Sequence, residues 1–432
     1  MVGAKRIALS RFFYSTVLYL ALPFVLARLV LRGFRNSDYF RFFGERFGHI
    51  RPTLLRPVIW LHAVSVGEVQ AALPLLKRLR KDFIGYEIFV TTTTPTGRAH
   101  LERHFGHQLR HAYFPYDLPH VVRRYLNRLQ PKLVLIMETE IWPNLLHHCR
   151  RRGIPTVLVN GRLSEKSARG YRRLGPVARR ALQDWSLIAA KSAEDATRFE
   201  QVGADATQVR VVGNLKFDVE VDEDSFARVQ ALRSQLGVGR PVWIAASTRD
   251  GEEPQILEAY QKVKQAIEQV LLVLVPRHPE RFDKVAELVE RADLAYDRRS
   301  EKNLCTGNVE VYLVDTMGEL RDLYAAADVA FVGGSLVDRG CHNLVEPASL
   351  GVPVVFGWST YNFADVAAEL KACGGGEQVA DSGRLAETVI KLLSDEALRR
   401  KMGVAARQLI LANRGATDRF VGVVGELLLR AK

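Results

Sequence analysis

The feature that most constrains the fold is an alternation between short apolar, β-branched runs and longer helical stretches, repeated along most of the 432 residues. The apolar runs are 58–64, 88–92, 132–137, 156–159 and 187–190 in the first half, and 242–246, 271–275, 309–314, 329–332 and 353–356 in the second. Strands of this length separated by helices are typical of parallel sheets that carry helices on both faces. The pattern therefore predicts an α/β fold.

The chain length and a break in this alternation predict two such domains. A chain of 432 residues with 47% hydrophobic residues exceeds one ordinary core. The alternation stops over the polar segment 219–240. We expect an N-terminal membrane-associated helix in residues 1–35 and two Rossmann-like, doubly wound domains in 36–225 and 226–432. The two domains would face each other across a cleft, and the last helices could pack back on the first domain.

The N-terminus contains a sixteen-residue segment without charge, Phe12 to Ala27, with basic residues on both sides. As a helix it spans about 24 Å, less than the roughly 30 Å of a hydrocarbon core, and Leu29 to Leu31 extend it if Arg28 snorkels. Arg28 also interrupts the run that a cleaved signal peptide needs. We expect an uncleaved anchor or an in-plane interfacial helix, with a buried core helix as the alternative. The flanking charges do not decide its orientation.

Basic residues concentrate in two places. Residues 1–56 contain ten Lys or Arg against Asp38 and Glu45, in a chain of net charge +13. Such patches suit the phosphates of nucleic acid or of lipid headgroups, and the apolar segment inside this first patch favours a membrane. The second patch, within 150–180, is either a phosphate-binding surface or a solvated helix face. Its centre holds Arg162, Lys166, Arg169, Arg172 and Arg173.

Polar residues follow the predicted strands of the first domain. They are Glu68 after a Gly, the Thr-rich turn 91–97, Glu138 and Glu140, and Asn160-Gly-Arg162. Because the carboxyl ends of parallel strands share one edge, where open α/β sheets bind ligands, these groups should converge. Glu68 is then a candidate general base, and a second carboxylate can raise its pKa or orient its partner. The alternative is that a Glu caps the next helix, which fits Glu140 better than Glu138.

The second domain offers segments suited to a nucleotide and its phosphate: 246–248, 276–281, 317–320, 333–335 and 342–347. Backbone N–H groups of the Gly333-Gly-Ser335 turn and of helix N-termini can bind an anion. Glu346, on the following helix, can accept both hydroxyls of a ribose. Neither GxGxxG nor GxxxxGK[ST] occurs, so neither a dinucleotide site nor ATP hydrolysis is indicated. The four cysteines show no paired spacing, which argues against a disulfide framework or a zinc site.

A series of ordered motifs runs through almost the whole chain. It comprises Phe43-Gly-Glu-Arg-Phe-Gly48, His62-Ala-Val-Ser-Val-Gly-Glu68, Thr93-Thr-Pro-Thr-Gly97, Tyr113-Phe-Pro-Tyr-Asp-Leu-Pro119, Pro131-Lys-Leu-Val-Leu-Ile-Met-Glu-Thr-Glu140 with Ile-Trp-Pro-Asn144, Asn214-Leu-Lys-Phe-Asp218, Val275-Pro-Arg-His-Pro-Glu-Arg-Phe282, Asp315-Thr-Met-Gly-Glu-Leu320 and Phe331-Val-Gly-Gly-Ser-Leu-Val337. With these motifs the chain resembles the 3-deoxy-D-manno-octulosonic acid (Kdo) transferases of lipid A biosynthesis.

The resemblance implies a GT-B glycosyltransferase fold, an N-terminal inner-membrane anchor and catalysis on the cytoplasmic face. The first domain would bind the acceptor, a lipid A precursor (lipid IVA), and the second the donor CMP-Kdo, a substrate rather than a cofactor. The reaction would invert the anomeric centre, with no cofactor, metal or nucleic acid expected. Another membrane-associated GT-B enzyme with a different nucleotide sugar is the nearest alternative, and a non-enzymatic membrane-surface binder is a further one.

The resemblance also implies roles for particular residues. Glu68 would be the general base, and Glu138 and Lys216 would support the transition state. The basic residues Arg162, Arg169 and Arg172 become candidates for the acceptor's phosphates. The expected CMP contacts are Pro276, Arg277, His278, Met317, Gly318, Glu319, Asn343, Leu344, Val345 and Glu346.

Two positions depart from the family pattern. Ser-Thr-His is common where this chain has Ser247-Thr248-Arg249, so any role of that His passes to Arg249 or disappears. Cys341 replaces a common Gly, so its backbone must avoid conformations that only Gly adopts easily, or accept strain.

Overall fold

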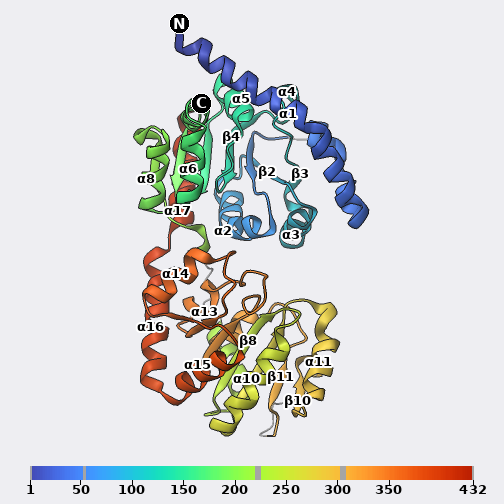
Figure 1. The fold of residues 1–432 in the computed structure, drawn as a ribbon, viewed down its shortest axis with the longest axis vertical. Helices are drawn as coiled ribbons and strands as arrows, with labels where there is room; N and C mark the ends of the chain where they lie inside the picture. The colour runs from blue at the N-terminus through green and yellow to red at the C-terminus, as the bar shows by residue number, and fades with distance from the viewer. Residues whose placement is uncertain (1, 52–54, 219–224, 302–307, 431–432) are drawn as a thin grey trace. The chain divides into compact units, whose positions relative to one another are not determined.

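The computed structural model describes residues 2–51, 55–218, 225–301 and 308–430. The chain divides into two compact units: Met1–Asp218 together with Arg414–Lys432, and Val219–Asn413. Each unit is built on a seven-stranded sheet flanked by helices (Figure 1). The first segment of the first unit ends at Asp218 rather than at residue 225. The C-terminal residues, from Arg414 onward, also belong to this unit.

The sheet of the first unit has the order β3-β2-β1-β4-β5-β6-β7, and all its strand pairs are parallel. All five residues of β1 are buried, because a central parallel strand is covered on both faces, and this explains its apolar sequence. The strands are β1 (Val58–His62), β2 (Glu87–Thr92), β3 (Arg110–Tyr113), β4 (Pro131–Met137), β5 (Thr156–Gly161), β6 (Leu187–Ala190) and β7 (Val209–Val211).

Helices connect these strands, and several begin with Pro, whose fixed φ and missing N–H suit the first helical turn. The helices are α2 (Val66–Asp82), α3 (Pro95–Phe105), α4 (Pro119–Leu129), α5 (Pro143–Arg151), α6 (Glu165–Arg173), α7 (Pro176–Gln183) and α8 (Ala193–Val202). Short 3₁₀ turns are η1 (Ser37–Tyr39), η2 (Phe43–Phe47), η3 (Gly106–Gln108), η4 (Ala206–Gln208) and η5 (Leu215–Phe217).

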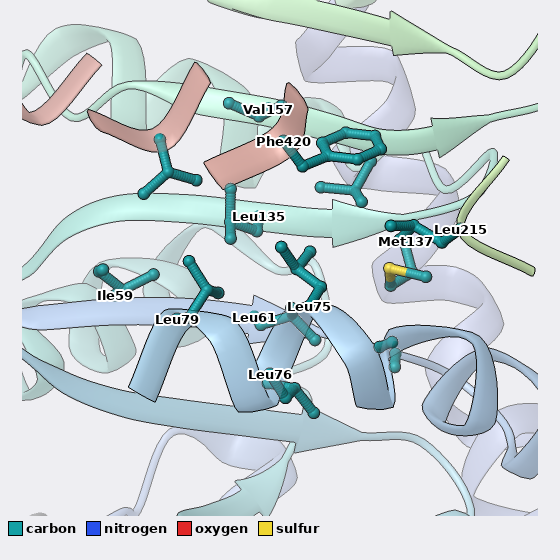
Figure 2. Packing of buried hydrophobic residues seen from close by; sticks show 14 of the residues in the cluster. Ile59, Leu61, Leu75, Leu76, Leu79, Leu135, Met137, Val157, Leu215 and Phe420 are labelled. Atoms are coloured by element: carbon teal, nitrogen blue, oxygen red, sulfur yellow. The ribbon is translucent and has the colours of Figure 1, made fainter. Parts of the chain in front are cut away.

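The last helix, α17 (Ala416–Arg430), completes the core of the first unit. Figure 2 shows Phe420 of α17 beside Leu135 of β4 and Val157 of β5, on the sheet face that α2 also covers. Burying a Phe side chain contributes about 1.5–3 kcal/mol. The Asp218 carboxylate accepts a hydrogen bond from the Gly415 N–H at 2.7 Å, which fixes the point where the chain returns. Of the last helices, α17 therefore packs on the first unit, whereas α16 (Glu396–Asn413) belongs to the second.

The long N-terminal helix α1 (Val2–Arg35, blue in Figure 1) packs against α5 and α7 of the first unit. The Tyr14 hydroxyl donates to Oδ2 of Asp117 at 3.0 Å, and Tyr19 stacks on His120. Residues Arg11–Phe34 are long and apolar enough to cross a membrane, and only 11% of the most apolar window is buried. The alternative of a buried core helix was therefore wrong. Its large exposed side chains include Phe12, Phe13, Val17, Leu20, Phe24, Leu31 and Phe34.

The second unit repeats the architecture with the strand order β10-β11-β9-β8-β12-β13-β14, again parallel throughout. Its strands are β8 (Val242–Thr248), β9 (Leu271–Pro276), β10 (Tyr296–Arg298), β11 (Val311–Leu313), β12 (Val329–Val332), β13 (Val354–Phe356) and β14 (Gly376–Gln378). Its other helices and turns are α9 (Ser225–Leu236), α10 (Glu253–Ala266), η6 (Pro279–Arg281), α11 (Phe282–Arg291), η7 (Arg299–Glu301), α12 (Leu320–Ala325), α13 (Val345–Ser349), α14 (Ala364–Ala372) and α15 (Ser382–Ser394).

Each sheet has a topological switch point, where neighbouring strands continue in opposite directions along the sheet. It lies between β1 and β4 in the first unit and between β8 and β12 in the second. Open α/β sheets bind their ligands at the carboxyl ends of the strands at such points. The residues that follow these four strands are therefore the first candidates for a functional site.

Candidate active site

Glu68 lies in the first turn of α2, which begins a short loop after the end of β1. Its carboxylate turns back to accept a hydrogen bond from the Val64 N–H at 2.8 Å, and the Ser65 hydroxyl lies 3.4 Å away. The donor Val64 precedes Ser65, the N-cap of α2, so Glu68 binds the loop that leads into the helix and does not cap its first turn. Burial, followed by the negative charges of Glu138 and then Glu140, raises its pKa to about 8. A carboxyl with such a pKa can exchange a proton near neutral pH.

Glu138 follows β4, the strand next to β1 across the switch point. Its N–H donates to the Val159 carbonyl at 2.8 Å, which continues the pairing with β5. Its φ of 54° lies in the left-handed region, which costs a non-glycine residue on the order of 1 kcal/mol or more. This turn brings the Glu138 carboxylate within electrostatic reach of Glu68. The sequence-based expectation of converging carboxylates at this edge is met.

Glu140 does not cap α5, so that interpretation was wrong. Its Oε2 instead lies 3.2 Å from Nε2 of His62 and accepts a hydrogen bond from the Trp142 indole at 3.0 Å. The start of α5 is capped by Asp117, whose carboxylate accepts the N–H groups of the first turn at 2.8 and 3.0 Å. Because Asp117 already satisfies these donors, Glu140 is left to join the buried His62 at the carboxylate cluster.

Lys216 lies in η5, which packs against α2, the helix that carries Glu68. The Lys216 N–H donates to the Asn214 side chain at 3.1 Å, and the Leu215 N–H donates to the Asn160 side chain at 3.1 Å. Asn160, next to the last residue of β5, has a φ of 56°. The carboxyl end of β5 thus fixes the backbone of η5, and the half-buried Lys216 belongs to the same region of the first unit as Glu68.

The basic residues proposed for the acceptor lie after β5 and on α6. Arg162 is exposed in the loop before the helix. On α6 itself, Glu165 accepts from Arg172 at 3.0 Å and lies 3.9 Å from Arg169. Exposed pairs of this kind contribute little to stability, so these cations can exchange their partner at low cost.

The residues expected to contact CMP fall in three segments, all at the carboxyl edge of the second sheet. Pro276 ends β9 and residues 277–278 follow it, 317–319 follow β11, and 343–346 lie beyond β12 at the start of α13. Met317 and Gly318 are exposed, and Glu319 pairs with Arg299 at 2.7 Å, which lowers the pKa of Glu319. Burial raises the pKa of the Glu346 carboxyl.

The Gly333-Gly-Ser335 turn does bind an anion, but that anion belongs to the protein. Glu252 is buried and accepts hydrogen bonds from the backbone N–H groups of Gly334 at 2.6 Å, Ser335 at 2.9 Å and Leu336 at 2.9 Å. The proposal that this turn holds a ligand phosphate was therefore wrong. The carboxylate already satisfies those donors, and the turn is a structural element of the switch point.

Cys341 adopts no left-handed conformation, and the positive φ of 62° in this loop belongs to its neighbour Gly340. The substitution of the common Gly therefore causes no backbone strain. Among the described residues, no group of three or more His, Cys, Asp or Glu side chains is arranged to hold a metal ion.

Sequence reasoning missed three features of these sites: the contacts of Glu140 with His62 and Trp142, the cap from Asp117, and the role of Glu252. Asp117 stands two residues before Pro119, which begins α4. A carboxylate so placed is a recognisable candidate cap, although for α4 rather than α5. The sequence indicated a role for Glu252 only weakly, because it is one of two adjacent Glu residues after an apolar strand.

Comparison with known proteins agrees with this arrangement. Residues 41–219 match the family described as 3-Deoxy-D-manno-octulosonic-acid transferase (kdotransferase), and residues 254–409 match Glycosyl transferases group 1. The 3-deoxy-D-manno-octulosonic acid transferase of Haemophilus influenzae is 37% identical over 97% of this chain and 99% of its own length. That of Bordetella pertussis is 41% identical over 89% of this chain and 90% of its own.

Among solved structures, UDP-GlcNAc 2-epimerase from Neisseria meningitidis superposes with a TM-score of 0.56 over 87% of this chain and 100% of its own. At 13% identity this likeness concerns the fold alone. It agrees with the GT-B fold of two Rossmann-like domains. The extent of identity with the two transferases shows more than the fold: the chain is a glycosyltransferase that belongs to the 3-deoxy-D-manno-octulosonic acid (Kdo) transferase family.

Proposed function

We propose that this enzyme transfers Kdo from CMP-Kdo to a lipid A precursor, lipid IVA, in lipopolysaccharide biosynthesis, with inversion at the anomeric carbon and Glu68 as the general base. The observation that carries the proposal is the Glu68 carboxyl at the switch point of the first sheet, with its pKa raised to about 8 beside Glu138 and Glu140. Such a group can accept the proton of an acceptor hydroxyl at physiological pH.

The chemistry needs few groups. An acceptor hydroxyl attacks the anomeric carbon, its proton passes to Glu68, and the C–O bond to the CMP phosphate breaks, so that CMP leaves with its electron pair. No covalent sugar intermediate is required, and positioning and electrostatics provide most of the rate. Glu138 would support the transition state by keeping Glu68 basic, and Lys216 by its positive charge.

The second unit would bind the donor. Arg277 and His278 follow β9, Met317 to Glu319 follow β11, and Asn343 to Glu346 lead into α13, so these segments share the edge where such sheets bind nucleotides. Glu346 would accept the ribose hydroxyls. Its pKa is raised by burial, and hydrogen bonds from two hydroxyls would compensate the ionised carboxylate.

The acceptor would bind the first unit through its phosphates and its acyl chains. Arg162, Arg169 and Arg172 provide exposed positive charge near the carboxyl end of β5, and a phosphate could replace Glu165 as the partner of the latter two. The exposed apolar face of α1 would lie in the membrane. We place the enzyme at the inner membrane with its two domains on the cytoplasmic face, where the donor is available.

The test is incubation of the purified full chain with CMP-Kdo and tetraacylated lipid A, read by mass spectrometry. The wild type should add the mass of Kdo, and Glu68→Gln should lose about a hundredfold or more in turnover while still binding CMP. Glu102→Gln, at an exposed position of α3, is the matched control and should retain activity. Absence of a Kdo increment with active donor would refute the proposal. Binding of UDP in preference to CMP would instead favour a GT-B enzyme with another donor.

A further inference from the structure

Arg249 is the first residue after β8, at the switch point of the second sheet. Its Nε donates to Nε2 of His342 at 3.0 Å, and its Nη1 contacts Nε2 of His278. The two histidines come from different loops, because His278 follows β9 and His342 lies beyond β12. One guanidinium therefore connects the two loops that flank the end of β8.

The two histidines hold the guanidinium without neutralising its charge. Burial, and then the positive charge of Arg249, lowers the pKa of His342 to about 3, and the same two causes lower the pKa of His278. Both imidazoles are therefore neutral near pH 7 and can accept a hydrogen bond from the arginine through one ring nitrogen. These contacts fix the direction of the guanidinium and leave its positive charge in place.

Further cations gather around Arg249. Arg277 and Arg339 are close enough to lower its pKa, after the larger effect of its own burial, whereas Glu252 raises it. A third cation, Arg281, lowers it less and already pairs with Asp250 and Glu253. Like charges that repel one another in a partly buried region reduce stability unless an anion compensates them. The strands and loops of the switch point nevertheless hold this cluster together. Clusters of this kind are typical of sites that bind a phosphate or a carboxylate.

Four backbone N–H groups at the same edge already have an acceptor. The N–H groups of Gly334, Ser335 and Leu336, which would otherwise form an anion site, already bind the buried carboxylate of Glu252. The Arg249 N–H binds the same carboxylate at 2.9 Å. These four N–H groups are therefore not available to an anionic ligand, whereas the guanidinium of Arg249 is a charged donor that the surrounding residues fix in direction.

We propose that Arg249 binds the phosphate of the donor nucleotide, and that His342 and His278 are positioning residues that orient its guanidinium. The inference rests on the proposed function for the identity of the donor. It assigns a binding role to the position where the family commonly has His. A purely structural role, in which Arg249 only ties the two loops together, is the competing explanation.

The test is calorimetric titration of the full chain with CMP and, separately, with cytidine, which lacks the phosphate. Arg249→Gln keeps a side chain that can donate a hydrogen bond to an imidazole and removes the charge. It should weaken CMP binding about ten- to hundredfold and leave cytidine binding unchanged, because a hydrogen bond to a charged group has about that effect. Arg249→Lys keeps the positive charge but loses the two-point contact with the histidines. Its CMP affinity should lie between those of the wild type and Arg249→Gln. Arg291→Gln, an exposed residue of α11 paired with Glu287, is the matched control.

Each other outcome overturns the inference in a distinguishable way. An equal loss of CMP and cytidine affinity in Arg249→Gln would show that the residue only holds the loops in place. Unchanged CMP affinity in both variants would overturn the phosphate contact while leaving the donor assignment intact. Failure of the wild type to bind CMP would overturn the proposed donor, and this inference with it.

Discussion

Nε2 of His62, at the end of β1, lies 3.2 Å from Oε2 of Glu140, beyond the end of β4. The other ring nitrogen lies 3.0 Å from the Thr91 hydroxyl, which in turn accepts from the Trp60 indole at 2.9 Å. Nδ1 also lies 3.0 Å from the Thr91 carbonyl oxygen. A proton on Nε2 is donated to Glu140, and a proton on Nδ1 is donated to the Thr91 carbonyl, so each ring nitrogen has a partner. One buried side chain thus joins the core of the first sheet to the carboxylate cluster at its edge.

Replacement of His62 by Phe should destabilise the first unit. Phe keeps the ring that stacks on Phe114 at 3.8 Å but removes both hydrogen bonds, so that Thr91 and Glu140 each lose a partner. The free energy of unfolding should fall by about 1–3 kcal/mol. Urea titration followed by tryptophan fluorescence measures it. Trp142→Phe removes only one donor from the same carboxylate at a less buried position, and should cost less. Equal stability of His62→Phe and wild type would contradict the network.

The pH dependence of catalysis should show how the negative charges near Glu68 raise its pKa. A general base acts when it is deprotonated, so kcat/KM should rise with pH through the pKa of about 8. Glu138 raises this pKa by its negative charge, and Glu138→Gln should therefore move the rising limb to lower pH. The measurement is the pH at which kcat/KM rises. The maximum value of kcat/KM is not used, because it also depends on any direct role of Glu138.

Glu140→Gln is the matched comparison for this shift. Glu140 raises the pKa of Glu68 less than Glu138 does, so the limb should move in the same direction by a smaller amount. An unmoved limb in Glu138→Gln, or a larger shift in Glu140→Gln, would contradict the electrostatic account.

The strands that could be predicted from the sequence are the inner strands of the two sheets. The strands that could not be predicted lie at the sheet edges. All ten expected apolar runs form strands. The four strands not predicted, β3, β7, β10 and β14, are the outer strands of the two sheets, and each has only three or four residues. An edge strand has one neighbour and an open side, so it needs no continuous apolar run. Its position depends on the strand beside it, which the local sequence does not encode.

The candidate site divides in a similar way. Glu138 and Arg277 directly follow a strand, and Glu68 lies in the first turn of the helix after β1. These positions could be located because strand ends converge in a parallel sheet. The partners of Glu140 and Glu252 could not, because each depends on a segment far along the chain: His62 is 78 residues from Glu140, and Gly334 is 82 residues from Glu252. Local patterns predict where a carboxylate stands, whereas its hydrogen-bond donors are set by the packing of the whole unit.

The apolar face of α1 should bind membranes. Leu20 and Phe24 are 70% and 79% exposed, and burying a side chain of this size contributes about 1.5–3 kcal/mol. Replacing both with Glu should reduce co-sedimentation with phosphatidylglycerol-containing vesicles by about a hundredfold or more. The pair Val404→Glu and Leu411→Glu, at exposed apolar positions of α16, is the control and should bind as the wild type does. Equal vesicle binding by both double variants would exclude α1 as the membrane contact.

Gly333 should tolerate no side chain, because it lies where β12 and β8 end side by side at the switch point. A Cβ added there would stand 2.7 Å from the Ser247 carbonyl oxygen and 2.8 Å from Thr248 Cα, both backbone atoms that cannot rotate away. Gly333→Ala should therefore lower stability by about 1–3 kcal/mol and weaken CMP binding, because Arg249 follows Thr248 directly. Denaturation and CMP titration measure the two effects. At Gly422, in α17, an added Cβ meets no described atom within 4 Å, so Gly422→Ala should instead stabilise the chain by about 0.5–1 kcal/mol and leave CMP binding unchanged. Normal stability of Gly333→Ala would mean that the β8 turn can move, and an Arg249 held by such a turn would lose its fixed direction.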